Sequence, residues 1–278
     1  MITTRTPLRI TLGGGGSDLE TGQGICLAAT IDKYVTVTVS ESWDDDYLLH
    51  YSQTERVRHV DEIRHRIIRD VFKALDVPPG IQVSSHADVP AGTGLGNSGA
   101  FTVGLLKALR PEWSRRQLAD MAVELDIGQQ DQWSAVFGGT NVYDFDAGTI
   151  FPVETALEFE LYYTGIKRDA AEILTGPPKP VTVAREQVRE MVDGLENDDA
   201  GFVGALLHEQ WLAKYKESPT PEHDAIDAWI QEGRMNGASG GKLVGAGGGG
   251  FILFLGEPAG LYGRRLSIAL THEGSRCL

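Results

Sequence analysis

The feature that most constrains this chain is a glycine-rich loop over residues 90–100, Pro-Ala-Gly-Thr-Gly-Leu-Gly-Asn-Ser-Gly-Ala. Residues 80–87 before the loop predict a strand, and the residues from Ser98 to about Leu109 predict a helix. Small residues at a strand-to-helix turn let backbone N–H groups approach an anion, and the helix dipole adds about half a positive charge. A flexible linker is the alternative, but strand and helix bound the loop tightly. The loop therefore predicts a cradle for phosphate groups.

Two other phosphate-binding loops fit the glycines less well. Residues 94–99 satisfy the G-x-G-x-x-G pattern of dinucleotide-binding proteins, which makes an NAD-dependent oxidoreductase one alternative. That fold needs an acidic residue at the end of a second strand about 20 residues later, whereas Asp120 lies inside a helical pattern. Residues 236–243 are the other candidate, for the phosphate-binding pattern G-x-x-x-x-G-K-[ST]. They do not match it, because Asn236 stands at the first glycine and Leu243 at the Ser or Thr position.

The composition of the chain argues against nucleic acids and membranes as partners. The chain of 278 residues has 25 Lys and Arg against 39 Asp and Glu, a formal net charge of −14. Affinity for nucleic acids depends on basic side chains, so we expect no nucleic-acid partner. The two cysteines, Cys26 and Cys277, are too few for a disulfide framework, and no stretch of 18 apolar residues occurs. We therefore expect a cytoplasmic protein that does not bind membranes.

The order of the predicted elements indicates an α+β fold in two lobes, 1–150 and 151–278. Residues 34–40 predict the clearest strand, since valines alternate there with hydroxyl side chains. Ser114, three residues before Gln117, predicts a capping box that starts a helix over 114–125. Further strands are predicted over 5–12, within 138–146 and 149–163, at 242–244 and at 251–255, and further helices over 60–75, 182–196, 199–217, 221–236 and 258–271.

Three motifs, in order along the chain, resemble those of the GHMP small-molecule kinases. The first runs over residues 6–18, from Thr-Pro-Leu-Arg-Ile to Gly-Ser-Asp, and the second is the loop at 90–100. The third, at 242–251, reads Lys-Leu-Val-Gly-Ala-Gly-Gly-Gly-Gly-Phe. The resemblance implies a two-lobed α+β kinase with a ribosomal-protein-S5-like N-terminal ATP-binding lobe and a ferredoxin-like C-terminal lobe. It also implies ATP and Mg²⁺ as cofactors.

Within this superfamily the chain most resembles the bacterial D-glycero-D-manno-heptose 7-phosphate kinases. The first motif carries this likeness together with residues 130–139 (Gln-Asp-Gln-Trp to Phe-Gly-Gly) and 237–242 (Gly-Ala-Ser-Gly-Gly-Lys). It implies ATP-dependent phosphorylation of the anomeric hydroxyl of a heptose 7-phosphate, which yields the 1,7-bisphosphate. For the assembly we expect a monomer or a homodimer. A fucokinase- or galactokinase-like sugar kinase stays open, as does a pseudokinase that binds nucleotide or sugar without efficient catalysis.

The resemblance implies that Asp131 is the catalytic base and that Arg9 lies beside it. Asp131 stands in a polar segment just ahead of an apolar turn. An aspartate with a neighbouring cation can stay ionised and accept the proton of a sugar hydroxyl. Taken singly, Asp131 would be a capping residue and Arg9 a surface arginine, but the three motifs together favour the catalytic interpretation.

The second motif implies the nucleotide-binding residues Pro90, Gly92, Gly94, Leu95, Gly96, Asn97, Ser98 and Gly99. Ser98 stands where the hydroxyl of the family's loop binds Mg²⁺, although spacing alone fits a helix cap equally well. The family has an acidic metal ligand on the helix before its catalytic aspartate, and that link is short in this chain. Either Asp126 or Glu124 takes this role, or Ser98 and ATP hold the metal alone.

Substrate contacts are implied on both lobes. Asp18 matches the aspartate that binds sugar hydroxyls in the galactokinase branch, and a carboxylate can accept two hydrogen bonds from neighbouring hydroxyls. Lys214 is suggested as the basic contact for a sugar phosphate, with Lys167 and Arg168 as alternatives. The predicted substrate contacts are Gly15, Ser17, Asp18, Lys214, Gly247 and Gly248.

Overall fold

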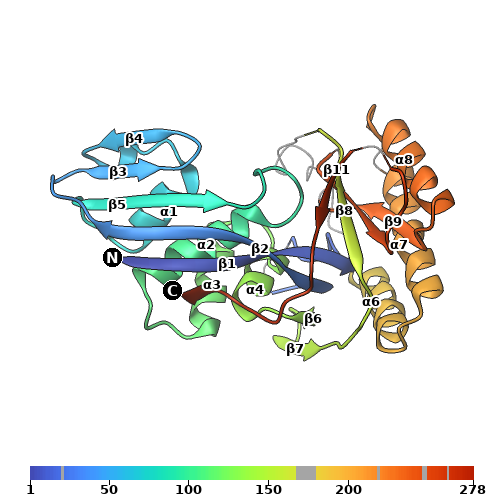
Figure 1. The fold of residues 1–278 in the computed structure, drawn as a ribbon. Coiled ribbons are helices and arrows are strands. Elements are labelled where there is room, and N and C mark those ends of the chain that lie inside the picture. Colours follow the sequence, from blue (N-terminus) through green and yellow to red (C-terminus); the bar gives the residue numbers. More distant parts are fainter. Residues whose placement is uncertain (20–21, 167–179, 218–219, 246–248, 262) are drawn as a thin grey trace.

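Two lobes lie side by side in the computed structural model (Figure 1), which describes residues 1–19, 22–166, 180–217, 220–245, 249–261 and 263–278. Each lobe combines a β-sheet with packed helices, which confirms the predicted α+β class. The division near residue 150 stays a prediction. Over the described ranges, no helix has both the length and the apolar character needed to cross a membrane.

The N-terminal lobe is built on one sheet with the strand order β12-β1-β2-β5-β3-β4, and β6 lies beside β2 with β7 outside it. β3 and β5 run parallel, and the other neighbours are antiparallel. The strands are β1 (Ile2–Gly13), β2 (Ile25–Glu41), β3 (Tyr47–His50), β4 (Thr54–Val57), β5 (Ile81–Ala87), β6 (Thr140–Asp144), β7 (Thr149–Pro152) and β12 (Arg276–Cys277).

β2 contains the predicted strand at 34–40, whose valines are buried and whose hydroxyl side chains are half-buried. The strand begins earlier than predicted, at Ile25. Residues 25–31 are buried without alternation, so period-two patterning could not mark them. Helices and neighbouring strands cover this half of β2, which makes it the centre of the lobe's core.

Helix α2 (Asn97–Leu109) begins close to its predicted start and packs on β1 and β2. The Thr4 hydroxyl donates to the carbonyl of Gly104 at 2.9 Å. A Cβ on Gly104 would lie 3.0 Å from the Thr6 hydroxyl, so glycine lets the helix backbone come close to the sheet. This packing fixes where the N-terminus of α2 stands.

The other helices of this lobe are shorter. The helix predicted over 60–75 is divided into a 3₁₀ turn at Val60–Glu62 and α1 at Arg66–Ala74, because Ile63 adopts extended backbone between them. α3 (Arg115–Leu125) starts at the predicted capping box, and α4 (Gln130–Phe137) follows after a short link.

The C-terminal lobe has an antiparallel sheet with the order β11-β8-β10-β9. α7 packs so closely on β9 that a Cβ on Gly240 would lie 1.8 Å from the carbonyl oxygen of Gly204. The elements are α6 (Val181–Glu196), α7 (Ala200–Glu217), α8 (His223–Met235), β8 (Phe159–Tyr163), β9 (Gly240–Leu243), β10 (Phe251–Leu255) and β11 (Arg264–Ser267).

The helix predicted over 258–271 is wrong, because this segment forms strand β11 on the edge of the second sheet. Gly260 and Gly263 adopt φ values of +69° and +125°, which a helix does not accommodate. The apolar side chains at 266, 268 and 270 follow the strand period instead. The chain then crosses to the first lobe, where β12 pairs with β1 (Figure 1).

Candidate active site

The N-terminus of α2 is open. Its N-cap residue is Gly96, at φ +77°, and no side chain caps the helix. Gly92 and Gly94 also adopt positive φ values, +73° and +82°, which L side chains rarely adopt. Pro90 and Leu95 complete the turn, and the Pro90 carbonyl accepts the Asn97 amide at 3.2 Å. Over the described ranges no side chain accepts the backbone N–H groups at 97–99, as expected of the phosphate cradle that the sequence predicts.

The third glycine motif supports this loop from the other lobe. A Cβ on Gly94 would lie 2.7 Å from the Val244 carbonyl oxygen, and a Cβ on Gly245 would lie 2.5 Å from the Cα of Gly94. A Cβ on Gly250 would lie 2.3 Å from the carbonyl oxygen of Thr93. These glycines are required because two backbones meet there. Gly247 and Gly248, predicted as substrate contacts, lie outside the described residues.

Arg9 and Asp131 meet at the start of α2. Two guanidinium nitrogens of Arg9 bind the same carboxylate oxygen of Asp131, with Nε at 2.7 Å and Nη2 at 2.6 Å from Oδ1. Arg9 also donates through Nη1 to the Gly94 carbonyl at 2.5 Å. A Cβ on Gly99 would lie 2.7 Å from the Cβ of Asp131, so glycine allows this close approach. The predicted base and its basic partner are thus brought to the glycine loop before α2.

The carboxylate of Asp131 has one oxygen available. Its side chain is 24% exposed, and within the described part of the chain Oδ2 carries no hydrogen bond. Burial raises the pKa of Asp131 above the usual value, Arg9 opposes this, and the charges of Asp18 and Asp126 add to it. A carboxylate with a raised pKa and an oxygen without a hydrogen bond has the properties of a general base.

Two of the three predicted metal ligands, Ser98 and Asp126, lie in contact. The Ser98 hydroxyl donates to Oδ2 of Asp126 at 2.6 Å, and Oδ1 of Asp126 accepts from Arg66 at 2.9 Å. Glu124 lies near the end of α3 with an exposed side chain. The short link before α4 therefore brings Asp126, rather than Glu124, to the loop hydroxyl.

This pair of oxygen donors fits Mg²⁺. The ion prefers oxygen ligands and usually takes one or two from the protein, with phosphates and water completing its shell. Over the described ranges, no three His, Cys, Asp or Glu side chains converge as a metal cluster. A metal beside Ser98 and Asp126 would therefore share its coordination with a bound polyphosphate.

The predicted substrate contacts near β1 form a compact loop. Both carboxylate oxygens of Asp18 accept backbone N–H groups, and its side chain is buried. The Ser17 hydroxyl donates to the carbonyls of Gly14 and Ile25, at 2.9 and 2.8 Å, which shapes the loop. A Cβ on Gly15 would lie 2.9 Å from the Thr11 side chain. Their contact with substrate stays a prediction.

Lys214 is brought to the same region from α7. Its ammonium group donates to the carbonyl of Gly245 at 2.5 Å, next to the glycines that support the phosphate loop. Lys167 and Arg168, the alternatives for this role, lie outside the described residues. The contact of Lys214 with a sugar phosphate stays a prediction.

Two polar residues were missed by the sequence analysis as site residues. Lys242 is buried in β9 and donates to the Leu12 carbonyl at 3.3 Å and to Gln210 at 2.7 Å, so it ties the second lobe to the end of β1. Gln129 is buried at the start of α4, where its side chain binds the loop around Asp18. For Lys242 the available signal was its place next to the apolar Leu243 and Val244, whereas Gln129 stands in a polar segment that gives no such signal.

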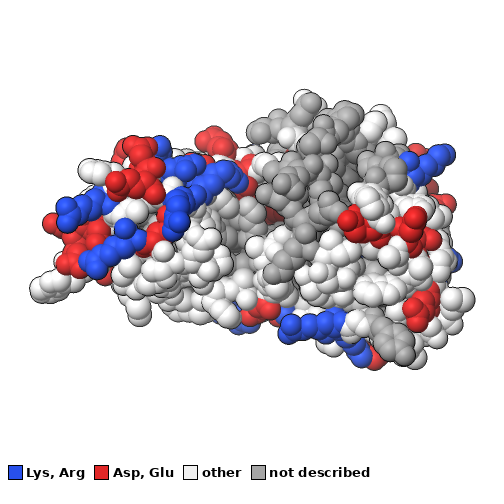
Figure 2. Space-filling model, turned by 90° about the horizontal axis from the view of Figure 1, so that it is seen from above, with Lys and Arg blue, Asp and Glu red and all other residues white. Residues whose placement is uncertain are grey.

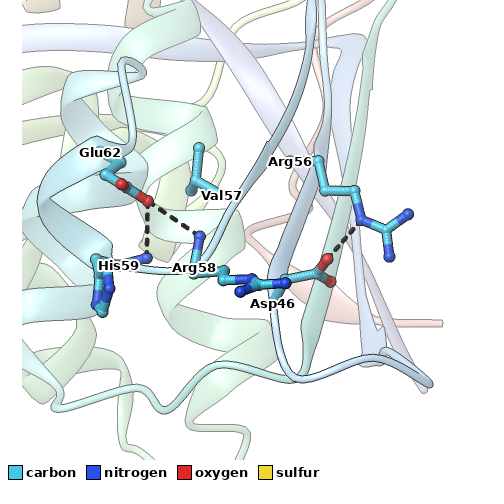
Figure 3. A pocket seen from close by; sticks show the side chains of 6 residues that line it. All are labelled: Asp46, Arg56, Val57, Arg58, His59 and Glu62. Carbon is cyan, nitrogen blue, oxygen red and sulfur yellow. Dashed lines mark hydrogen bonds and ion pairs between the residues drawn. The ribbon is translucent and has the colours of Figure 1, made fainter.

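A separate pocket of about 650 Å³ lies on the β3–β4 side of the N-terminal lobe (Figure 3). It contains Arg56, whose Nε donates to Asp46, and Glu62, which accepts the N–H groups of Arg58 and His59. None of these residues belongs to the predicted site. On the face in Figure 2, basic and acidic side chains are intermixed over this end of the molecule.

Known proteins resemble this chain over most of its length. The sequence matches the model of the GHMP kinases N terminal domain over residues 62–139 and that of the GHMP kinases C terminal domain over 191–261. A D-glycero-alpha-D-manno-heptose 7-phosphate kinase from Campylobacter jejuni is 29% identical, over 94% of this chain and 91% of its own length. A galactokinase from Pyrococcus furiosus is 24% identical, over 91% of this chain and 88% of its own length.

Solved structures share the fold. A D-glycero-D-manno-heptose 1-phosphate kinase from Bacteroides thetaiotaomicron has a TM-score of 0.77 at 23% identity, covering 100% of this chain and 99% of its own. A Lactococcus lactis galactokinase complexed with galactose also has a TM-score of 0.77, at 16% identity, covering 100% of this chain and 95% of its own. At these identities the likeness establishes the arrangement of the two lobes and no substrate.

Proposed function

This chain belongs to the GHMP kinases, and on that premise we propose that it transfers the terminal phosphoryl group of ATP to the anomeric hydroxyl of a heptose 7-phosphate. Transfer to a sugar hydroxyl is the activity that its relatives indicate. The observation that carries the proposal is the contact between Arg9 and Asp131 at the open N-terminus of α2. It places a basic carboxylate beside the cradle predicted for the triphosphate.

In the proposed reaction, the N–H groups at the start of α2 hold the phosphates. Oδ2 of Asp131 accepts the proton of the anomeric hydroxyl while the hydroxyl oxygen forms a bond to the γ-phosphorus. The bond from that phosphorus to the β–γ bridging oxygen breaks, and ADP leaves. Arg9 keeps Asp131 in place through Oδ1. Ser98 and Asp126 would hold Mg²⁺, which neutralises charge on the phosphates when bound.

The choice of a heptose 7-phosphate is supported by two observations. The Campylobacter jejuni relative that bears this substrate in its name spans nearly all of the chain. Lys214 also places an ammonium group beside the third glycine motif, where it could contact a second phosphate on the sugar. Galactokinase and fucokinase relatives make a simple hexose the second candidate.

The test is ADP release by the purified chain with a panel of acceptors: heptose 7-phosphate, unphosphorylated heptose, galactose and L-fucose. Phosphorus NMR of the product identifies the esterified carbon. We expect turnover of heptose 7-phosphate with phosphate on the anomeric carbon, and loss of turnover in Asp131→Asn. The variant Asp120→Asn, an exposed carboxylate on α3, is the matched control.

Three outcomes would contradict the proposal. Preference for galactose or L-fucose would establish another sugar kinase. Binding of ATP and sugar with no turnover in either protein would establish a pseudokinase. Full activity of the Asp131→Asn variant would show that Asp131 is not the catalytic base, whichever sugar is used.

A further inference from the structure

Helix α4, which carries Asp131 in its first turn, is capped by a residue distant in sequence. Its own N-cap residue, Gln129, supplies no side-chain cap. Instead Oδ2 of Asp18 accepts the N–H of Gln129 at 3.1 Å and the N–H of Gln130 at 3.0 Å. Asp18 is 4% exposed, so this carboxylate is satisfied by the helix rather than by water. A carboxylate at this position also complements the helix dipole.

The contact is reciprocated by Gln129. Its side-chain amide nitrogen donates to the carbonyl of Asp18 at 3.3 Å and to that of Gln23 at 2.9 Å. Its amide oxygen accepts the N–H of Gly22 at 2.9 Å. A Cβ on Gly128 would lie 3.2 Å from Oδ2 of Asp18, so glycine keeps the approach open. The loop after β1 and the start of α4 therefore form one hydrogen-bonded unit.

We propose that Asp18 is a positioning residue for Asp131, which it holds in place by capping the first turn of α4. The inference rests on the proposed function, in which Asp131 is the base. Arg9 fixes the side chain of Asp131 through Oδ1, and Asp18 fixes the backbone that presents that side chain. Displacement of a catalytic group by about 1 Å can lower a rate about a hundredfold, so a cap next to the base matters for catalysis.

This role differs from the sugar contact predicted for Asp18. A residue that binds sugar affects the KM for sugar when it is changed. A residue that positions the base affects kcat and leaves both KM values nearly unchanged. The two roles also differ in what asparagine can replace. Both backbone N–H groups of α4 share a single oxygen of Asp18, and asparagine keeps one such acceptor.

The experiment compares Asp18→Ala and Asp18→Asn with the wild type on the preferred sugar. We expect kcat to fall roughly 10- to 100-fold in Asp18→Ala, with KM for sugar and ATP within about twofold. Asp18→Asn should recover most of kcat. Asp146→Asn is the matched control, because Asp146 accepts the N–H of Gly24 elsewhere on the same loop and does not cap α4. We expect kcat of this control to stay near the wild-type value.

Hydrogen exchange supplies a second readout that needs no turnover. The amides of Gln129 and Gln130 should exchange faster in Asp18→Ala and at the wild-type rate in Asp18→Asn and Asp146→Asn. A rise in the sugar KM in both Asp18 variants, with kcat unchanged, would overturn the inference, as would unchanged exchange in Asp18→Ala. Failure of the proposed function is separate, because a wild type that prefers another sugar allows the same comparison, and an inactive one still allows the exchange measurement.

Discussion

A carboxylate held by a buried guanidinium is a weak base unless its surroundings oppose that cation. At Asp131 burial is the stronger influence, because it raises the pKa although Arg9 lowers it. The charges of Asp18 and Asp126 act in the same direction as burial. Asp131 therefore becomes protonated at a higher pH than an ordinary aspartate, and its carboxylate is a stronger base.

This direction predicts the pH dependence of the reaction. The rate needs deprotonated Asp131, so kcat should rise with pH through a midpoint above the ordinary aspartate value of 3.8. Arg9→Met removes the cation that lowers this pKa, so the midpoint should move to higher pH and the maximal rate should fall. Profiles of kcat against pH measure both effects. Arg265→Met, on the edge of the C-terminal lobe, is the control, and an unchanged or lower midpoint in Arg9→Met would contradict the assignment.

The neighbouring acids Asp126 and Glu124 allow a matched test of the metal site. Asp126 contacts the Ser98 hydroxyl, whereas Glu124 is exposed. Asp126→Asn should weaken Mg²⁺ binding about 10- to 100-fold, comparable to the loss of a ligand-orienting group, and Glu124→Gln should leave it unchanged. Calorimetric titration of Mn²⁺ into the protein with a non-hydrolysable ATP analogue measures this without turnover. Equal weakening in both variants would argue against a specific role of Asp126.

Among the elements, those with a local signal were predictable and those set by distant partners were not. The capping box of Ser114 and Gln117 and the alternation at 34–40 both describe what the structure shows. The helix predicted over 258–271 is wrong because β11 depends on pairing with β8, about a hundred residues earlier in the chain. The cap that Asp18 gives to α4 has no local signal either, since Asp18 and Gln130 are 112 positions apart.

The glycine loop before α2 offers a prediction that separates backbone strain from steric contact. Gly94 and Gly260 have similar positive φ values, +82° and +69°. A Cβ on Gly94 would lie 2.7 Å from the Val244 carbonyl oxygen, whereas a Cβ on Gly260 would meet nothing within 4 Å. Gly260→Ala should cost about 1 kcal/mol of unfolding free energy from strain alone. Gly94→Ala should cost more and should also weaken ATP binding.

Urea unfolding measures the two free energies, and equilibrium binding of a fluorescent ATP analogue measures the affinities. Equal destabilisation by the two substitutions would mean that the contact between the second and third glycine motifs is loose. Normal ATP affinity in a folded Gly94→Ala protein would mean that the loop does not form the phosphate cradle.

The two lobes are joined more extensively than a single crossing of the chain requires. Arg185 of α6 binds both oxygens of Asp144 at 2.6 and 3.1 Å and also reaches Asp146. Lys242 and Gln210 both donate to the carbonyl of Leu12, just before the four glycines at 13–16 of the first motif. The order of the motifs can be read from the sequence, but the contact between Lys242 and Leu12 joins residues 230 positions apart, and only the structure reveals it.

The end of the chain adds a third connection, because residues 270–278 leave the C-terminal lobe and pack on the N-terminal one. Thr271 and Thr30 share a backbone hydrogen bond of 2.9 Å, Ser275 donates to the Ala135 carbonyl of α4 at 2.7 Å, and Gly274 fits closely against Val136. A protein shortened after Ala269 should therefore lose stability in the N-terminal lobe, where the partners of residues 270–278 lie. Each lost backbone bond costs about 1 kcal/mol, so the total should be several kcal/mol.

Hydrogen exchange resolves where that loss falls. We expect faster exchange in β1 and α4 of the shortened protein and little change in β8 and β10, since the tail's partners are in the first lobe. Removal of Leu278 alone is the control, because it deletes only the N–H that donates to Thr3. Loss of protection confined to the C-terminal lobe would mean that residues 270–278 stabilise the sheet of β8–β11 instead. Loss centred on α4 would mean that the C-terminal end of the chain helps to hold the helix that carries Asp131.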